Sequence, residues 1–117
     1  MRFLVIMTPV ETAVTNLKAQ KILKIITSHV EYLEDLQMQG KVVESGSFAG
    51  LRGGFGILDV ESLNELNDIV NLDPAMPYMD TKLYPLVSGE DRVRQLKKRM
   101  QMEAETEGLS LEQETPQ

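Results

Sequence analysis

His29 is the one histidine of this 117-residue chain and the first side chain to consider for chemistry. On a helical wheel it lies among Ile22, Ile26, Leu33 and Leu36, at the centre of an apolar stripe. Burial disfavours the charged imidazole, so a neutral ring that faces a pocket could act as a general base. The alternative is a core histidine that is hydrogen-bonded within the protein and takes no part in chemistry.

Two charged residues further along the chain are candidates to act with His29. Glu44 alternates with Val42 and Phe48 in a predicted strand and is expected on the same face as Phe48. There its carboxylate would either be exposed or orient His29. Arg52 lies in a predicted turn, where its guanidinium would either bind an oxyanion or enolate or be solvated.

Four glycines lie close together in "FAGLRGGFGILDVES", residues 48–62. A Walker phosphate loop requires a lysine and opens a helix, but a strand pattern without lysine follows here. The dinucleotide fingerprint fails as well, because Asp59 takes the place of its third glycine. These glycines therefore do not predict a nucleotide site.

The glycines are better interpreted as a turn followed by a strand, one face of which lacks side chains at two positions. Gly50 and Gly53 can supply the positive φ of a hairpin turn. Gly54 and Gly56 are two apart in a strand, so they share a face and leave a trough on it. A helix side chain, a partner sheet or a bound ligand would fill this trough.

These candidates are positioned by an alternation of strands and amphipathic helices. The hydrophobic patterns predict strands at 2–7, 41–50, 53–60 and 78–87, and helices at 19–38, 61–71 and 88–108. The resulting β-α-β-β-α-β order is that of a ferredoxin-like α+β fold, with two helices on one face of a four-stranded antiparallel sheet. Gly46 is a candidate for a bulge, and Pro85 places the last strand at an edge.

The chain is expected to divide into a folded domain at 1–88, a C-terminal helix at 89–107 and an acidic, disordered tail at 108–117. The apolar stripe of the last helix is narrow and consists of Val93, Leu96 and Met100. The helix therefore needs another surface against which this stripe can be buried. The uncovered sheet face would be a binding surface or a dimer interface. A homodimer or higher homo-oligomer is therefore expected.

Composition excludes several classes of function. The chain has no cysteine, so disulfides and thiolate chemistry are absent. The net charge is −6, but five glutamates lie after residue 102, which leaves −1 for residues 1–102. No basic patch for nucleic acid and no membrane-spanning stretch is apparent. The N-terminus reads as a strand rather than a signal peptide, so a cytoplasmic location is the default expectation.

Four segments resemble muconolactone isomerase and its relatives: "MRFLVIMT", "FAG", "ILDVES" and "MPYMD", in order between residues 1 and 87. The resemblance implies a dimeric α+β barrel with a small-molecule site between sheet and helices. It also implies proton transfer in an unsaturated lactone without metal or organic cofactor. Tyr78, in "MPYMD", is then expected near the pocket mouth, Asp80 is expected to fix its loop, and Met7 is expected in an adaptable apolar lining.

This chain departs from the basic pocket that the resemblance implies. Leu4 and Ile6 stand where such enzymes carry basic side chains, and Ser47 and Leu51 stand at the corresponding places near the hairpin. An apolar, polyketide- or terpenoid-like substrate is therefore expected, with isomerase- or cyclase-type proton transfer. His29 and Glu44 are the expected catalytic pair.

Two other interpretations stay open. The same barrel architecture hosts cofactor-free oxygenases, which is an analogy from fold. The few titratable residues that are expected to face inward also suit a ligand-binding or assembly protein without catalysis.

Overall fold

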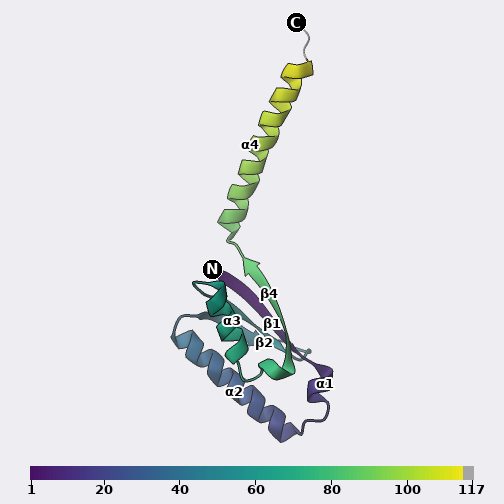
Figure 1. The fold of residues 1–117 in the computed structure, drawn as a ribbon, viewed down its shortest axis with the longest axis vertical. Coiled ribbons are helices and arrows are strands. Elements are labelled where there is room, and N and C mark those ends of the chain that lie inside the picture. Colours follow the sequence, from purple (N-terminus) through teal and green to yellow (C-terminus); the bar gives the residue numbers. More distant parts are fainter. Residues whose placement is uncertain (115–117) are drawn as a thin grey trace. The chain divides into compact units, whose positions relative to one another are not determined.

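The computed structural model describes residues 1–114. Its elements follow the chain in the order β1 (Arg2–Pro9), α1 (Glu11–Val14), α2 (Ala19–Met38), β2 (Val42–Ser47), β3 (Gly54–Asp59), α3 (Leu63–Leu72), the 3₁₀ turn η1 (Met76–Tyr78), β4 (Met79–Leu86) and α4 (Gly89–Glu114) (Figure 1). Apart from the short α1 and η1, this is the predicted β-α-β-β-α-β order with a C-terminal helix. The predicted α+β fold class is therefore confirmed.

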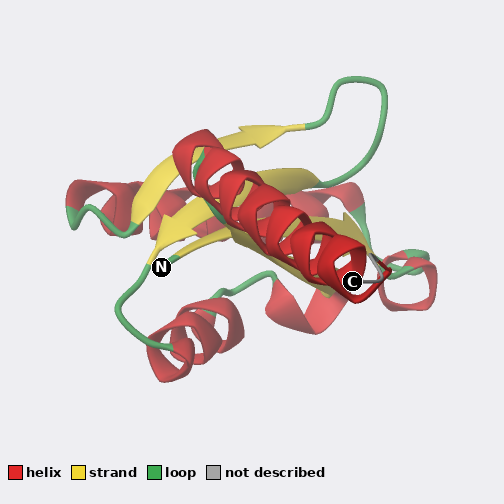
Figure 2. Cartoon of the chain, turned by 90° about the horizontal axis from the view of Figure 1, so that it is seen from above, coloured by secondary structure: helices red, strands yellow, loops and turns green. Residues whose placement is uncertain are grey.

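The four strands, yellow in Figure 2, form one antiparallel sheet. Their order in the sheet is β2-β3-β1-β4. β1 is central, which fits its run of apolar residues on both faces. The β2–β3 hairpin forms as predicted. β4 lies at the edge, where Pro85 stands opposite Phe3, because an edge strand tolerates a residue without an N–H donor.

The core lies between one face of this sheet and helices α2 and α3. Phe3, Val5 and Met7 of β1 are buried on that face, each two residues from the next. They form one cluster with further buried residues of the strands and helices, Leu36, Val42, Leu58, Val60, Leu66 and Ile69. Functional side chains on the inner sides of α2 and α3 are therefore held against a packed apolar layer.

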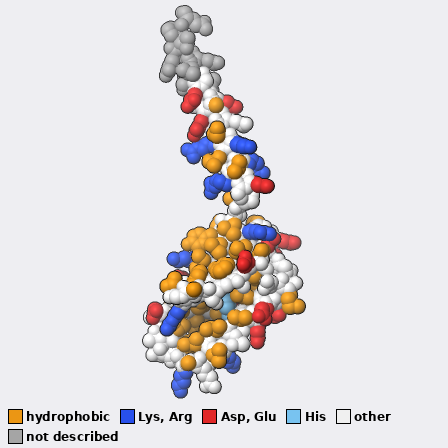
Figure 3. All heavy atoms as spheres, turned by 180° about the vertical axis from the view of Figure 1, so that it is seen from behind, with side chains coloured by type: hydrophobic (Ala, Val, Ile, Leu, Met, Phe, Trp, Pro, Cys, Tyr) orange, Lys and Arg blue, Asp and Glu red, His pale blue; other side chains and the backbone are white. Residues whose placement is uncertain are grey.

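The opposite face of the sheet is covered by no helix of the Met1–Leu86 unit. Leu4 and Ile6 lie on this face and are only partly buried, beside Ile57 and Phe55 of β3. Tyr84 of β4, opposite Leu4, is 46% exposed. In Figure 3, hydrophobic side chains, drawn in orange, cover much of the visible face of this unit. In a single chain, therefore, only one of the two apolar faces of β1 is buried.

Two details of the predicted pattern are wrong. The irregularity in β2 falls between Val42 and Glu44, so Val43 is the extra residue and not Gly46. The inner stripe of α2 is also rotated from the predicted one, because Ile26 is 53% exposed whereas Ile25 is partly buried. Tyr32 packs against the core cluster on this inner side. His29 stays on the inner side, one turn before Leu33.

The helix ends follow local rules that are visible in the sequence. Ser62 caps α3, since its hydroxyl accepts a bond from the Glu65 amide, and the Glu65 carboxylate accepts one from the Glu61 amide. Gly40, at φ +76°, follows the end of α2. At the start of α4 the Ser88 hydroxyl accepts a bond from the Asp91 amide.

The chain divides into two compact units, Met1–Leu86 and Val87–Gln117. The second unit consists mainly of α4, which continues to Glu114 and so beyond the expected helix end at 107. The part of the expected tail up to Glu114 belongs to α4. Residues 115–117 lie outside the described residues, and disorder stays a prediction for them. Within the described residues no helix is both long and apolar enough to cross a bilayer.

Candidate functional site

A histidine–aspartate pair joins α2 to the end of α3. The Nδ1 atom of His29 lies 2.7 and 2.8 Å from the two carboxylate oxygens of Asp73. The Asp73 side chain is only 4% exposed, and that of His29 is 24% exposed. An ionised carboxylate only accepts hydrogen bonds, so the proton of a neutral imidazole is held on Nδ1 and the lone pair is left on Nε2.

Asp73 is positioned by its own sequence neighbours. Pro74 disfavours helical backbone in the residue before it, so α3 ends and Asp73 adopts an extended conformation at φ −63°, ψ 127°. The carboxylate then accepts a bond of 2.8 Å from the Ala75 amide, two residues further on. This second bond fixes the carboxylate independently of His29.

Tyr32 lies one turn after His29 on α2 and packs beside the same pair. Its hydroxyl donates a bond of 2.7 Å to the backbone carbonyl of Ile69 on α3. Burial, and secondarily the negative charge of Asp73, raise the pKa of Tyr32 above the ordinary value of 10.0. The phenol therefore stays neutral and holds α2 and α3 together near the pair.

The raised pKa of Tyr32 predicts a loss of stability in alkali. Above pH 10 the unfolded chain releases the phenol proton while the folded chain still holds it, so the free energy of unfolding falls as pH rises through the folded pKa. Chemical denaturation between pH 8 and 11 should show this fall. Tyr32→Phe should flatten it, whereas Tyr84→Phe, which leaves the bond to Ile69 intact, should not. An identical slope in the Tyr32→Phe chain would contradict the assignment.

Space for a methyl group lies over Gly56 on the helix-facing side of the sheet. Gly56 is buried and stands opposite Val5 of β1 and Ser45 of β2. A Cβ atom added to it would meet no heavy atom within 4 Å. The space that the sequence predicted over the glycine positions is therefore present at Gly56, on the side of the sheet where α2 and α3 pack.

Gly54 does not extend this space, although it shares the face by register. A Cβ atom there would lie 2.5 Å from the backbone carbonyl oxygen of Gly46. Gly54 is thus needed for the close approach of β2 and β3. Gly53, at φ +107°, is needed for the turn, where its added Cβ would collide with the backbone of Met7.

The structure does not pair Glu44 with His29. Glu44 stands opposite Ile57, so it lies on the uncovered face of the sheet and is exposed. Phe48 lies on the same side, stacked on Phe55 with 6.3 Å between ring centroids. Arg52 is exposed in the hairpin turn. These three predicted residues therefore lie away from the histidine, and a role for them in the same site stays a proposal.

Tyr78 and Met7 lie closer to the core layer. Met7 is buried on the helix-facing side of β1, opposite Gly54. Tyr78 is half-buried in η1, and its backbone carbonyl accepts a bond of 2.9 Å from the amide of Val10. Asp80 is exposed on β4. Leu4 and Ile6, the positions compared above with basic pocket residues, lie on the uncovered face and not beside His29.

Two residues of the site were missed by the sequence reasoning. Asp73 is 44 positions from His29, and no local pattern connects them. The available signal was an Asp-Pro step at a helix end, which favours a carboxylate bonded to the backbone. Tyr32 was visible only as the residue one turn after His29. Over the described residues, no three His, Asp or Glu side chains gather as a metal-binding group.

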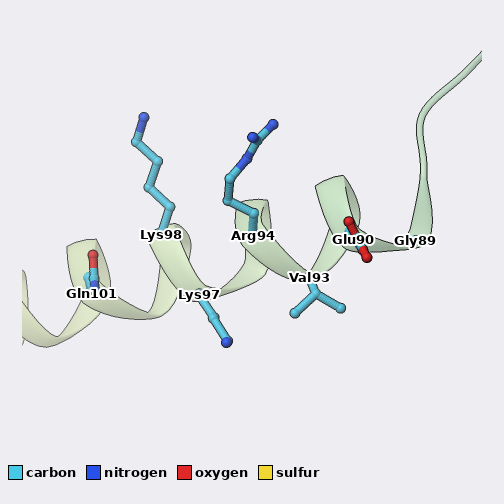
Figure 4. A pocket seen from close by; sticks show the side chains of 7 residues that line it. All are labelled: Gly89, Glu90, Val93, Arg94, Lys97, Lys98 and Gln101. Carbon is cyan, nitrogen blue, oxygen red and sulfur yellow. The ribbon is translucent and has the colours of Figure 1, made fainter.

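A separate surface hollow runs along α4 and carries no comparable chemistry. It is lined by residues of that one helix, Gly89, Glu90, Val93, Arg94, Lys97, Lys98 and Gln101 (Figure 4). Arg94 and Lys98 point to one side of the helix, and Val93 and Lys97 to the other. With walls from a single helix, this is open helix surface and not a small-molecule cavity.

Comparisons with known proteins agree with this architecture. The model of the muconolactone Δ-isomerase family matches residues 1–92. A muconolactone Δ-isomerase of Rhodococcus opacus is 36% identical over 67 residues, which are 56% of this chain and 72% of that protein. The crystal structure of a muconolactone isomerase has a TM-score of 0.64 at 27% identity, covering 75% of this chain and 90% of that one.

A second solved structure is similar in fold. It is the 5-chloro-2-hydroxyhydroquinone dehydrochlorinase of Burkholderia phenoliruptrix AC1100 in complex with 2,5-dihydroxybenzoquinone. Its TM-score is 0.62 at 22% identity, covering 78% of this chain and 98% of that one. At this identity the likeness shows the fold alone. Most of α4 lies beyond the residues that the family model matches.

Proposed function

The chain belongs to the muconolactone isomerase family, and from this premise we propose that it is a cofactor-independent enzyme that moves a proton within a small unsaturated molecule. The observation that carries the proposal is the His29–Asp73 pair, in which the buried carboxylate holds the Nδ1 proton. A fixed tautomer leaves Nε2 as the basic nitrogen, which is the arrangement that a general base requires.

The proposed reaction is a proton shift. Nε2 of His29 takes a proton from an activated carbon of the substrate, the double bond moves, and an enolate-type anion forms. The imidazolium that results is stabilised by the Asp73 carboxylate. The Nε2–H exchanges with solvent, and Nε2 then delivers a proton to a different carbon, so that no other reactant is consumed. Closure of a ring by the anion would give the cyclase form of this chemistry.

The substrate class is proposed to be apolar, such as a polyketide- or terpenoid-like intermediate. The space over Gly56 supports this, because its neighbours on the sheet include Val5 and Leu58, both buried and apolar. A ligand that binds over Gly56 would therefore meet apolar surface, which favours apolar ligands with few polar groups. The apolar character of Leu4 and Ile6 does not bear on this site, since they lie on the other face.

The uncovered sheet face supports a homodimer as part of the same proposal. Leu4, Ile6 and Tyr84 present a partly exposed apolar surface that a second sheet would cover. Glu44 and Phe48 would then lie in the dimer interior, where they could contribute to binding. The cytoplasmic location expected from the sequence stays a prediction.

Solvent-isotope exchange tests the proposed activity. The protein is incubated in D₂O with muconolactone and with larger neutral unsaturated lactones, and products are followed by mass spectrometry and oxygen electrode. Deuterium gain with movement of the double bond and no oxygen uptake is expected. Oxygen uptake would identify an oxygenase instead. Tight binding without exchange or turnover across the panel would indicate a ligand-binding protein.

A further inference from the structure

Helix α4 consists of two halves of opposite charge. Its first thirteen residues carry five basic and two acidic side chains, and the next thirteen carry five glutamates and no basic residue. The basic ones are Arg92, Arg94, Lys97, Lys98 and Arg99, and the glutamates are Glu103, Glu105, Glu107, Glu112 and Glu114. The sign changes between Arg99 and Glu103, near the middle of the helix.

This arrangement does not stabilise a lone helix. A helix C-terminus favours cations, but the last turn of α4 has no basic residue. The ion pairs within the described part of the helix, Arg94–Asp91 and Arg99–Glu103, are exposed and contribute little. A long helix in water usually depends on packing of an apolar face. α4 therefore requires a partner surface.

The helix also presents an apolar stripe. Val93, Leu96 and Met100 are 51%, 50% and 67% exposed, and their spacing of three and four places them on one side. Ala104 continues the same side one turn later. Within its own unit, as far as it is described, α4 has no other element to cover this stripe.

We propose that α4 is an assembly helix that pairs antiparallel with α4 of a second copy of this chain. In that orientation the basic half of each helix faces the acidic half of the other. The apolar stripes of the two helices overlap at Met100 and Ala104, near the middle of the pair. A parallel pair would place like charges opposite each other along the whole helix. Charge complementarity therefore selects both the partner and the direction of pairing.

Cross-linking between single thiols tests the pairing and its direction. The chain has no cysteine, so Lys97→Cys and Glu107→Cys each introduce one thiol. The two positions are about 15 Å apart along one helix. With a short bis-maleimide, mixed full-length chains should give Lys97→Cys to Glu107→Cys links about tenfold or more above links between identical chains, because the antiparallel pair brings these positions to the same height.

Charge reversal supplies the matched control. In the Lys97→Cys chain, Arg92→Glu, Arg94→Glu and Arg99→Glu should lower the mixed cross-link by about tenfold. Glu103→Lys with Glu105→Lys in the Glu107→Cys partner should restore it. Predominant links between identical chains would overturn the proposal, and so would the absence of links between helices. Failure of the charge-reversed partner to restore the link would also overturn it.

Discussion

Replacing His29 by Asn is expected to lower the rate of proton transfer by about 100-fold or more while the chain stays folded. An amide can hold a hydrogen bond near Asp73 but has no basic nitrogen to accept a proton from carbon. The measurement is the initial rate of deuterium exchange with a substrate found in the panel above, at saturating and at low concentration. Circular dichroism checks the fold. A folded His29→Asn chain with wild-type turnover would remove His29 from the mechanism.

Asp73→Asn tests whether the carboxylate sets the tautomer of His29. The amide oxygen can still accept from Ala75, but its NH₂ group would donate to Nδ1 and move the ring proton to Nε2. The basic nitrogen would then face the new amide group instead of the substrate, so we expect a loss of about 100-fold or more in rate. Asp68→Asn is the matched control, since this exposed residue of α3 makes the same change of charge.

The pattern of elements could be predicted because it depends on local periodicity. The α2 range of 19–38 is correct to the residue, since an amphipathic stripe ends just before Gly40, which takes positive φ. The edge position of β4 followed from Pro85, which has no N–H to donate to a neighbouring strand. These signals are contained in a few adjacent residues, and tertiary packing did not override them.

The candidate site could be predicted only in part, because its two halves come from distant segments. His29 was found from its place on an apolar stripe. Its partner was expected to be Glu44, but the extra residue at Val43 and the placement of Glu44 opposite Ile57 put that carboxylate on the far face of the sheet. Asp73 takes the partner position because the end of α3 packs against α2. This packing is part of the tertiary structure, and no pattern in neighbouring residues predicts it.

Two glycines that look equivalent in the sequence should respond in opposite ways to the same substitution. Gly54→Ala is expected to lower the free energy of unfolding by about 1–3 kcal/mol, because the new Cβ meets a backbone carbonyl that no side-chain rotation can move away. Gly56→Ala is expected to leave it unchanged or to raise it by up to about 1 kcal/mol, because the methyl group enters open space and restricts the unfolded chain. Urea denaturation of both variants gives the comparison.

A larger side chain at Gly56 tests whether the substrate binds over this residue. Gly56→Leu should occupy the space above this residue and extend beyond it, so KM should rise about tenfold or more in a chain that circular dichroism shows to be folded. His29 would keep its bond to Asp73, so any turnover that remains should still depend on His29. A folded Gly56→Leu chain with wild-type kcat/KM would show that the substrate binds elsewhere. In the urea experiment, an unchanged free energy of unfolding for Gly54→Ala would show that β2 and β3 do not approach so closely at Gly54.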